Sequence, residues 1–108
     1  MIQFGLKQED KDKINDVFSS YECIDSVVIY GSRAKGNFKV GSDIDLTIIE
    51  NSLTFPEFLE IENTLDDLLL PYKIDLSMKR KISNVDLLSH IDRVGKLFYK
   101  RGNSPELR

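Results

Sequence analysis

Two aspartates spaced two residues apart open an apolar run and are the clearest chemical feature of this 108-residue chain. Asp43 and Asp45 begin a run that ends near Ile49. Because alternate side chains of a β-strand share a face, both carboxylates project to one side and the apolar residues project to the other. Aspartate is disfavoured in strands and adjacent like charges repel, so a bound cation is the simplest explanation of the pair. Two oxygen donors on one face suit Mg2+, which retains waters and binds substrate phosphates.

A third carboxylate stands in a short strand predicted over residues 71–78. Ile74 and Leu76 belong to one face of this strand, and Asp75 lies alone on the other. A neighbouring strand in the same sheet would bring Asp75 beside the Asp43/Asp45 pair. Three carboxylates around two Mg2+ ions suit an in-line displacement at phosphorus, in which the ions lie about 3.5–4 Å apart and stabilise the attacking and leaving oxygens.

A Gly-Ser turn adds a candidate site for phosphate. Gly31 and Ser32 follow an apolar run over residues 26–30. Glycine lets the backbone approach a phosphate closely, and Ser32 opens a short helical turn whose free N–H groups can bind the anion. Arg33 has two alternatives, a contact to phosphate or structural packing and pairing. Ser42 either begins the strand or holds a carboxylate or phosphate with its hydroxyl.

The elements that must position these residues follow the order α-β-(short α)-β-α-β-α. A first helix is predicted over residues 8–21, where apolar side chains recur at helical spacing. A second helix begins at Thr54 with a capping box, and Pro71 stops further helix. The last helix starts near Ser83 and has Gly95 as its C-cap, before a short edge strand. The predicted fold class is α/β (α+β), a small mixed β-sheet with helices packed on one side.

Length, charge and cysteine content restrict the classes of function. The length fits a single domain over residues 1–108, with residues 102–108 as a flexible tail. A net charge of −3 gives no basic surface for general nucleic-acid binding. No apolar stretch reaches 18 residues and no signal-peptide pattern is present, so we expect no membrane association. The single cysteine, Cys23, rules out an internal disulfide and suits the reducing cytoplasm.

Two further features have competing interpretations. His90 is the only histidine and has no other His or Cys at ligand spacing, so we interpret it as a surface or partner-facing residue rather than a proton shuttle. The run Lys79-Arg80-Lys81 follows the strand that carries Asp75. It either reaches a triphosphate or an acidic partner, or forms a solvated loop.

The combined pattern resembles the nucleotidyltransferase superfamily that includes DNA polymerase β. The closest resemblance is to its minimal nucleotidyltransferases (MNT), which pair with HEPN-domain proteins in prokaryotic toxin–antitoxin systems. The family pattern of Gly-Ser, about ten residues, Asp-x-Asp and a later strand aspartate is met by Gly31, Ser32, Asp43, Asp45 and Asp75. Arg33 and Gly36 match the extended Gly-Ser-Arg-Ala-(Arg/Lys)-Gly form, and residues 91–99 resemble the family's ending. The resemblance covers nearly the whole chain.

The resemblance implies Mg2+-dependent transfer of AMP from ATP, with release of pyrophosphate, to a hydroxyl of a HEPN-domain ribonuclease toxin. The acceptor would be a tyrosine, and the chain would act as an antitoxin. The implied catalytic residues, which would also hold two Mg2+ ions, are Asp43, Asp45 and Asp75. Asp75 would also accept the proton of the attacking hydroxyl. The implied nucleotide-binding residues are Gly31, Ser32, Arg33 and Ser42.

Three alternatives stay open. The first is a small-molecule transferase of the aminoglycoside type, with a missing substrate domain supplied by a homodimer. The second is a non-catalytic binder that keeps the motif for nucleotide sensing and inhibits its partner by contact. The third is nucleotide addition to tRNA, which the acidic charge balance disfavours. The intact aspartates favour catalysis over binding alone. The preferred base, the number of AMP units transferred and the oligomeric state are not readable from the sequence.

Overall fold

Helices and strands alternate along residues 2–102, the part of the chain that the computed structural model describes. The elements in chain order are β1 (Ile2–Gln3), β2 (Leu6–Lys7), α1 (Gln8–Ser19), β3 (Ile24–Tyr30), α2 (Gly31–Lys35), β4 (Ile44–Glu50), α3 (Phe55–Asp67), β5 (Ile74–Met78), the 3-10 helix η1 (Lys79–Lys81), α4 (Val85–Val94) and β6 (Lys96–Lys100). The predicted order is confirmed, and the structure adds η1 and the hairpin of β1 and β2. Most of the predicted tail, residues 103–108, lies outside the described residues.

A mixed four-stranded sheet with the order β5-β4-β3-β6 forms the centre of the fold. Strand β4 is antiparallel to β3 and parallel to β5, and β6 is antiparallel to β3. The alternation predicted for β4 is present, because Leu46 and Ile48 are fully buried while Asp45, on the other face, is half-buried. The mixed sheet is therefore confirmed.

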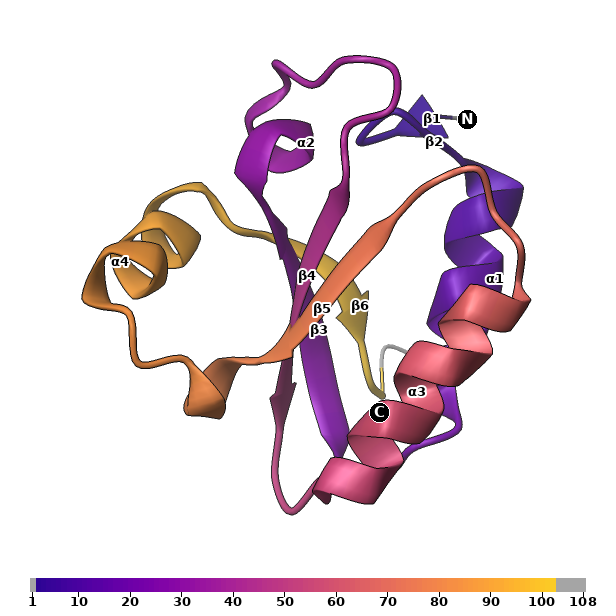
Figure 1. Ribbon diagram of the computed structural model, residues 1–108, viewed down its shortest axis with the longest axis vertical. Helices are drawn as coiled ribbons and strands as arrows, with labels where there is room; N and C mark the ends of the chain where they lie inside the picture. The colour runs from indigo at the N-terminus through magenta and orange to yellow at the C-terminus, as the bar shows by residue number, and fades with distance from the viewer. Residues whose placement is uncertain (1, 103–108) are drawn as a thin grey trace.

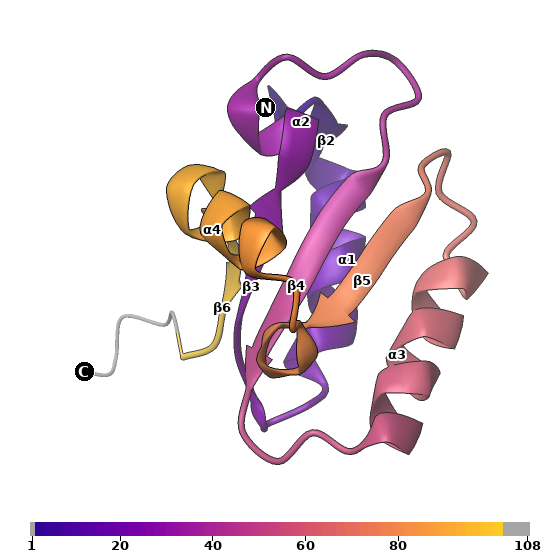
Figure 2. The ribbon, with the colours of Figure 1, turned by 60° about the vertical axis from the view of Figure 1, so that its left-hand side comes forward.

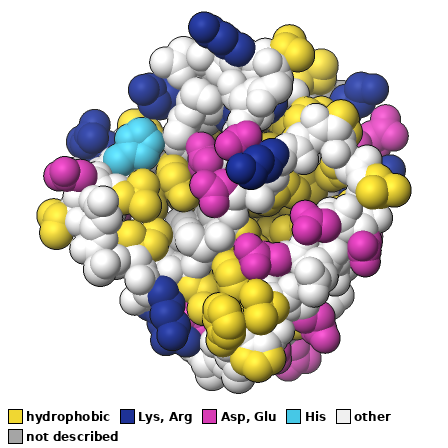
Figure 3. All heavy atoms as spheres, in the orientation of Figure 1, with side chains coloured by type: hydrophobic (Ala, Val, Ile, Leu, Met, Phe, Trp, Pro, Cys, Tyr) yellow, Lys and Arg dark blue, Asp and Glu magenta, His cyan; other side chains and the backbone are white. Residues whose placement is uncertain are grey.

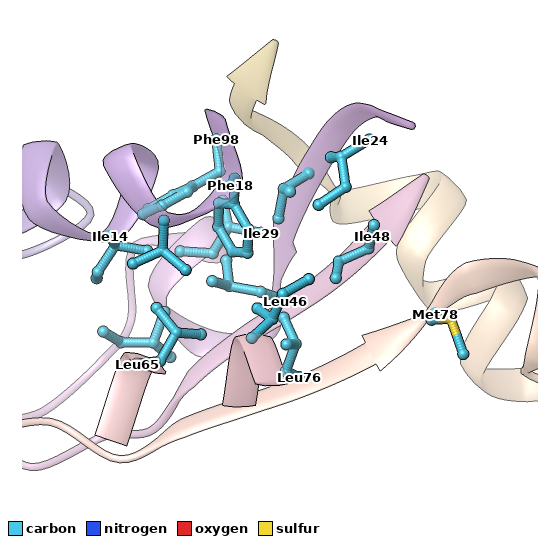
Figure 4. Packing of buried hydrophobic residues seen from close by; sticks show 14 of the residues in the cluster. Ile14, Phe18, Ile24, Ile29, Leu46, Ile48, Leu65, Leu76, Met78 and Phe98 are labelled. Carbon is cyan, nitrogen blue, oxygen red and sulfur yellow. The ribbon is translucent and has the colours of Figure 1, made fainter. Parts of the chain in front are cut away.

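Helices α1 and α3 cover one face of this sheet (Figures 1 and 2). Their apolar stripes meet the buried strand residues in one core, to which Ile14 and Phe18 contribute from α1 and Leu65 from α3 (Figure 4). Ile29 and Leu46 supply the facing surface of the sheet. Helix α3 begins with the predicted capping box at Thr54. No helix within residues 2–102 combines the length and apolar character needed to cross a membrane.

Helix α4 lies against the opposite face of the sheet, an arrangement that the prediction of helices on one side did not include (Figure 1). The chain must pass from β5 at one edge to β6 at the other edge, and α1 and α3 already occupy one face. The crossing therefore runs over the other face, where Thr47 of β4 is fully buried. A methyl group added to Gly95, directly after α4, would overlap the Ile91 carbonyl oxygen of α4 and the Val28 side chain of β3.

Helix boundaries differ from the prediction by one or two residues. Helix α1 ends at Ser19, two residues earlier than predicted. Helix α4 is capped by Asn84 instead of Ser83, because the Asn84 side chain accepts a hydrogen bond from the Leu87 N–H at 3.0 Å. Gly95 is the C-cap of α4, as predicted, and its backbone is extended, with φ −62°, instead of left-handed. Glycine is favoured there because a side chain would overlap both the Ile91 carbonyl at the end of α4 and Val28 of the sheet.

Candidate active site

The register of three neighbouring strands brings two of the predicted aspartates together. Asp45 of β4 is directly opposite Asp75 of the parallel strand β5, and Tyr30 of β3 is directly opposite Asp45 on its other side. Directly opposed residues share a face of a sheet, with Cβ atoms about 5 Å apart. Asp43 lies immediately before β4, outside the ladder of the sheet, and is exposed, as is Asp75. We call Asp43, Asp45 and Asp75 the aspartate site.

The charges of both other aspartates act on Asp45. Burial raises the pKa of Asp45, and the negative charges of Asp75 and then Asp43 raise it further, while His90 works in the opposite direction. Repulsion between like charges that share a site raises a carboxyl pKa in this way. Figure 3 shows a group of acidic side chains near the middle of this face, with the histidine beside it. The sheet therefore gathers negative charge on the face away from the main core.

Gly31 touches this site directly. It has φ +72°, a conformation that favours glycine, and a methyl group on its Cα would overlap the Asp45 carboxylate. Gly31 also begins the predicted short helix, α2. The turn between β3 and α2 and the central aspartate are thus packed against each other, and a side chain at position 31 would separate them.

Two residues that the sequence did not indicate as part of the site line it, and one of them, His90, which the sequence indicated as a surface or partner-facing residue, is half-buried there. His90 of α4 accepts a hydrogen bond from the Gly31 N–H at 3.2 Å, and its ring lies edge-on to Tyr30 with ring centroids 6.1 Å apart. Burial raises the pKa of the Tyr30 hydroxyl, a hydrogen bond with Ser77 opposes this, and Asp45 and Asp75 raise it further. Tyr30 could have been predicted from the alternation of side chains along β3, which puts it on the same face of the sheet as Asp45. The position of His90 depends on the crossing of α4, which no local pattern reveals.

A complete metal cage is not preformed. Within residues 2–102, no three side chains of His, Cys, Asp or Glu are arranged as a ready metal site. The candidate donors are the carboxylates of Asp43, Asp45 and Asp75, and the side chains of Asp43 and Asp75 are exposed. This donor set fits Mg2+, which is usually held by one or two carboxylates together with waters and substrate phosphates rather than by a protein cage.

A family model described as polymerase beta, nucleotidyltransferase matches residues 12–104, a span that contains the aspartate site and the Gly31 turn. The chain belongs to this family. No curated protein sequence matches the chain.

Several solved structures share the fold of this nucleotidyltransferase. A chain of a toxin–antitoxin complex with AMP-PNP is 20% identical with a TM-score of 0.67, covering 85% of this chain and 74% of that one. A chain of a tri-AMPylated Shewanella oneidensis HEPN toxin in complex with an MNT antitoxin is 18% identical with a TM-score of 0.64, covering 88% and 73%. A chain of the MntA–HepT toxin–antitoxin complex is 19% identical with a TM-score of 0.63, covering 87% and 73%. At these identities the similarity shows the fold, which agrees with the predicted minimal nucleotidyltransferase fold.

Three further residues, Ser32, Arg33 and Ser42, were predicted to bind the nucleotide. Arg33 and Ser42 instead make hydrogen bonds within the fold. Arg33 is buried, and its guanidinium donates hydrogen bonds to the backbone carbonyls of Ser42 and Phe4. The Ser42 hydroxyl accepts a hydrogen bond from the Lys39 N–H at 2.9 Å and so closes the turn before β4. These contacts belong to the structural alternatives that the sequence left open for both residues. Ser32 is half-buried in the first turn of α2, next to Gly31.

The basic run at the end of β5 lies at the other end of the sheet from the aspartate site. Arg80 pairs with the buried Glu50 carboxylate at the end of β4 and donates to the Leu53 carbonyl at 3.2 Å. The Lys79 Nζ lies 3.5 Å from the Asp92 Oδ1 and forms an ion pair with it. For Arg80, these contacts favour a structural role over contact with a nucleotide.

Proposed function

We propose that this nucleotidyltransferase uses Mg2+ to transfer AMP from ATP to a hydroxyl of a HEPN-domain toxin, and thereby acts as an antitoxin. The observation that carries the proposal is the register of β4 and β5, which sets Asp45 opposite Asp75, inside the matched family region, with the charge of Asp43 also acting on Asp45. Support for the acceptor comes from the similar folds, since one of those structures is a tri-AMPylated HEPN toxin in complex with an MNT antitoxin.

The roles of the residues follow from their placement. Asp43, Asp45 and Asp75 would hold Mg2+, which supplies Lewis-acid stabilisation of the phosphate oxygens when bound. The first turn of α2, beginning at Gly31 and Ser32, would lie against the phosphates of ATP and bind them with N–H groups other than that of Gly31, which donates to His90. Because Gly31 leaves no side chain between this turn and Asp45, the phosphates and the carboxylates would meet at one place.

The transfer itself is a displacement at the α-phosphorus. The acceptor oxygen forms a bond to phosphorus as the bond to the pyrophosphate oxygen breaks, and the acceptor proton passes to Asp75. Asp75 suits this role because its side chain is exposed, so an acceptor hydroxyl can approach it from solvent. The products are pyrophosphate and an acceptor that carries AMP. A tyrosine hydroxyl as the acceptor, a cytoplasmic location and the single-domain organisation over residues 1–108 stay predictions.

Intact-protein mass spectrometry tests the chemistry. With ATP, Mg2+ and the HEPN protein, we expect the partner to gain whole AMP units of about 329 Da each, since pyrophosphate leaves. Asp45→Asn is the control, and the partner should keep its unmodified mass with this variant. A gain of a phosphoryl group with release of ADP would replace this proposal with a kinase.

The remaining alternatives give separate results in the same experiment. Tight binding of the partner without any mass increase would favour the non-catalytic, nucleotide-sensing binder. Release of pyrophosphate only when an aminoglycoside is present would favour the small-molecule transferase. The exposed position of Asp43 and Asp75 leaves room for a large acceptor, which supports the protein substrate.

A further inference from the structure

A buried arginine links the segments that lead into the aspartate site. Arg33 is only 3% exposed, although its charge would be better solvated at the surface. Its Nε and one terminal nitrogen both donate to the Ser42 carbonyl oxygen, at 3.1 and 2.9 Å. Its other terminal nitrogen donates to the Phe4 carbonyl oxygen at 3.0 Å. Every nitrogen atom of the guanidinium is therefore committed to a backbone acceptor.

Two aromatic rings complete the surroundings of this guanidinium. The rings of Phe38 and Tyr72 each lie with their centroid 5.2 Å from the central carbon of Arg33. Cations within about 6 Å of an aromatic centroid are attracted to the ring face, and more strongly where water is excluded. The Tyr72 hydroxyl also donates to the buried Asp10 carboxylate of α1 at 3.3 Å. No acidic side chain within residues 2–102 forms an ion pair with Arg33 itself.

The segments held in this way are those that precede two of the aspartates. Ser42 directly precedes Asp43, so the carbonyl that accepts both hydrogen bonds belongs to the peptide bond joining the two residues. Tyr72 lies three residues before Asp75. Asp43 lies outside the ladder of β4, and the next backbone link is the hydrogen bond from the Ile44 N–H to the Lys73 carbonyl at 2.8 Å.

We propose that Arg33 is a positioning residue that fixes Asp43 and the approach to Asp75, and that it does not bind the nucleotide. Arginine suits this role because its planar fork can donate along several directions while the guanidinium also lies against aromatic rings. The inference rests on the proposed function, since it concerns the place where Asp43 would hold Mg2+. It selects the structural alternative for Arg33 over a phosphate contact.

Calorimetric titration of ATP, once in EDTA and once in excess Mg2+, tests this role without an acceptor. For Arg33→Met we expect affinity in EDTA close to that of the wild type. We expect the gain in affinity caused by Mg2+ to fall about 10- to 100-fold, the usual effect of losing a residue that orients a metal ligand. Arg33→Lys keeps the charge but not the planar fork, and should lose a similar share of the Mg2+-dependent gain.

Matched variants separate positioning from general loss of stability. Arg80→Met removes another arginine that binds a backbone carbonyl, at the far end of the sheet. It should lower the Tm and leave the Mg2+-dependent gain unchanged. Phe38→Leu removes one aromatic face and keeps Arg33, so it should reduce the gain in the same direction by a smaller factor. Arg33→Lys and Phe38→Leu decide the question if Arg33→Met does not fold.

Three results would overturn the inference, and they are distinguishable. Weaker ATP binding by Arg33→Met in EDTA, with Arg33→Lys like the wild type, would show a direct contact to phosphate. An undiminished Mg2+-dependent gain in folded Arg33→Lys and Phe38→Leu would show that Arg33 serves the fold alone. A wild type whose ATP affinity does not rise with Mg2+ would overturn the proposed function, and this inference with it.

Discussion

At the scale of single residues, Gly31 and Asp45 form one steric unit. The Asp45 carboxylate occupies the space that a side chain at position 31 would need, and the Gly31 backbone has φ +72°. The glycine of a Gly-Ser turn is usually explained by the close approach of phosphate to backbone. Here the Asp45 carboxylate already requires glycine at position 31, so the position of the turn and the position of the carboxylate depend on each other.

Gly31→Ala should therefore abolish nucleotide transfer. The added methyl group overlaps the Asp45 carboxylate and must displace it, and the left-handed backbone costs about 1–2 kcal/mol in addition. Gly36→Ala is the matched control, since Gly36 has φ +89° and open space around its Cα. Thermal melts should show a loss of stability in both variants, while AMP transfer should be lost only in Gly31→Ala. Equal activity in the two variants would contradict the steric argument.

Asp45→Asn separates the charge of the site from its shape. The folded protein raises the pKa of Asp45, mainly by burial and then by the charges of Asp75 and Asp43. Below the usual aspartate pKa the side chain is neutral in both the folded and unfolded states. As the pH rises through the raised pKa, the folded state must accept an unfavourable charge and loses stability. At neutral pH and without metal, the uncharged Asn should leave the fold as stable as the wild type or more stable by about 1 kcal/mol.

Melts of both proteins in EDTA and in excess Mg2+ measure this effect. Mg2+ should raise the Tm of the wild type by mass action and do much less for Asp45→Asn. Asp67→Asn, an exposed carboxylate at the end of α3, should respond to Mg2+ like the wild type. If Asp45→Asn melts well below the wild type in EDTA, the carboxylate is structural and the metal assignment loses its main support.

At the scale of elements, we expect a mutation that weakens α3 to lower the stability of the fold without changing AMP transfer. The Thr54 hydroxyl accepts a hydrogen bond from the Glu57 N–H, and the Glu57 carboxylate accepts one from the Thr54 N–H. Thr54→Ala should cost about 1 kcal/mol of stability. Thr64→Ala on the same helix should cost little, because the Thr64 hydroxyl only bonds back to the Glu60 carbonyl. Urea melts measure both changes, and AMP transfer below the unfolding transition should be unaffected in both variants.

Local patterns predicted the elements well because each signal lay within a few residues. Alternation in the sequence put Asp45 and Asp75 on the polar face of two strands, and the register of β4 and β5 places them side by side. The capping box at Thr54 was readable for the same reason. Contacts between segments that are far apart in the sequence have no local pattern from which they could be predicted. The bond from Gly31 to His90 spans 59 residues, and the bond from Arg33 to Phe4 spans 29.

At the scale of the whole molecule, the main hydrophobic core and the aspartate site lie on opposite faces of the sheet. Helices α1 and α3 bury one face, and α4 covers only part of the other, which leaves the aspartate site open beside it (Figures 1 and 3). Acidic residues number 18 and basic residues 15 in the chain. Among the basic side chains near the site, the Arg33 guanidinium is buried in the fold and not presented to solvent.

This charge balance predicts that RNA is a poor acceptor. Binding to a nucleic-acid backbone gains its affinity from cations that replace condensed counterions, so it weakens steeply as salt rises. We expect fluorescence anisotropy of a labelled tRNA to show no saturable binding at low salt, with or without Mg2+. ATP in the same buffer should bind, which serves as the control for an intact site. Tight tRNA binding that declines steeply between low and physiological salt would favour nucleotide addition to tRNA over modification of a protein. A net charge of −3 makes that outcome unfavourable, because the aspartate site and the polyanion would repel each other at every approach that lacks bound metal.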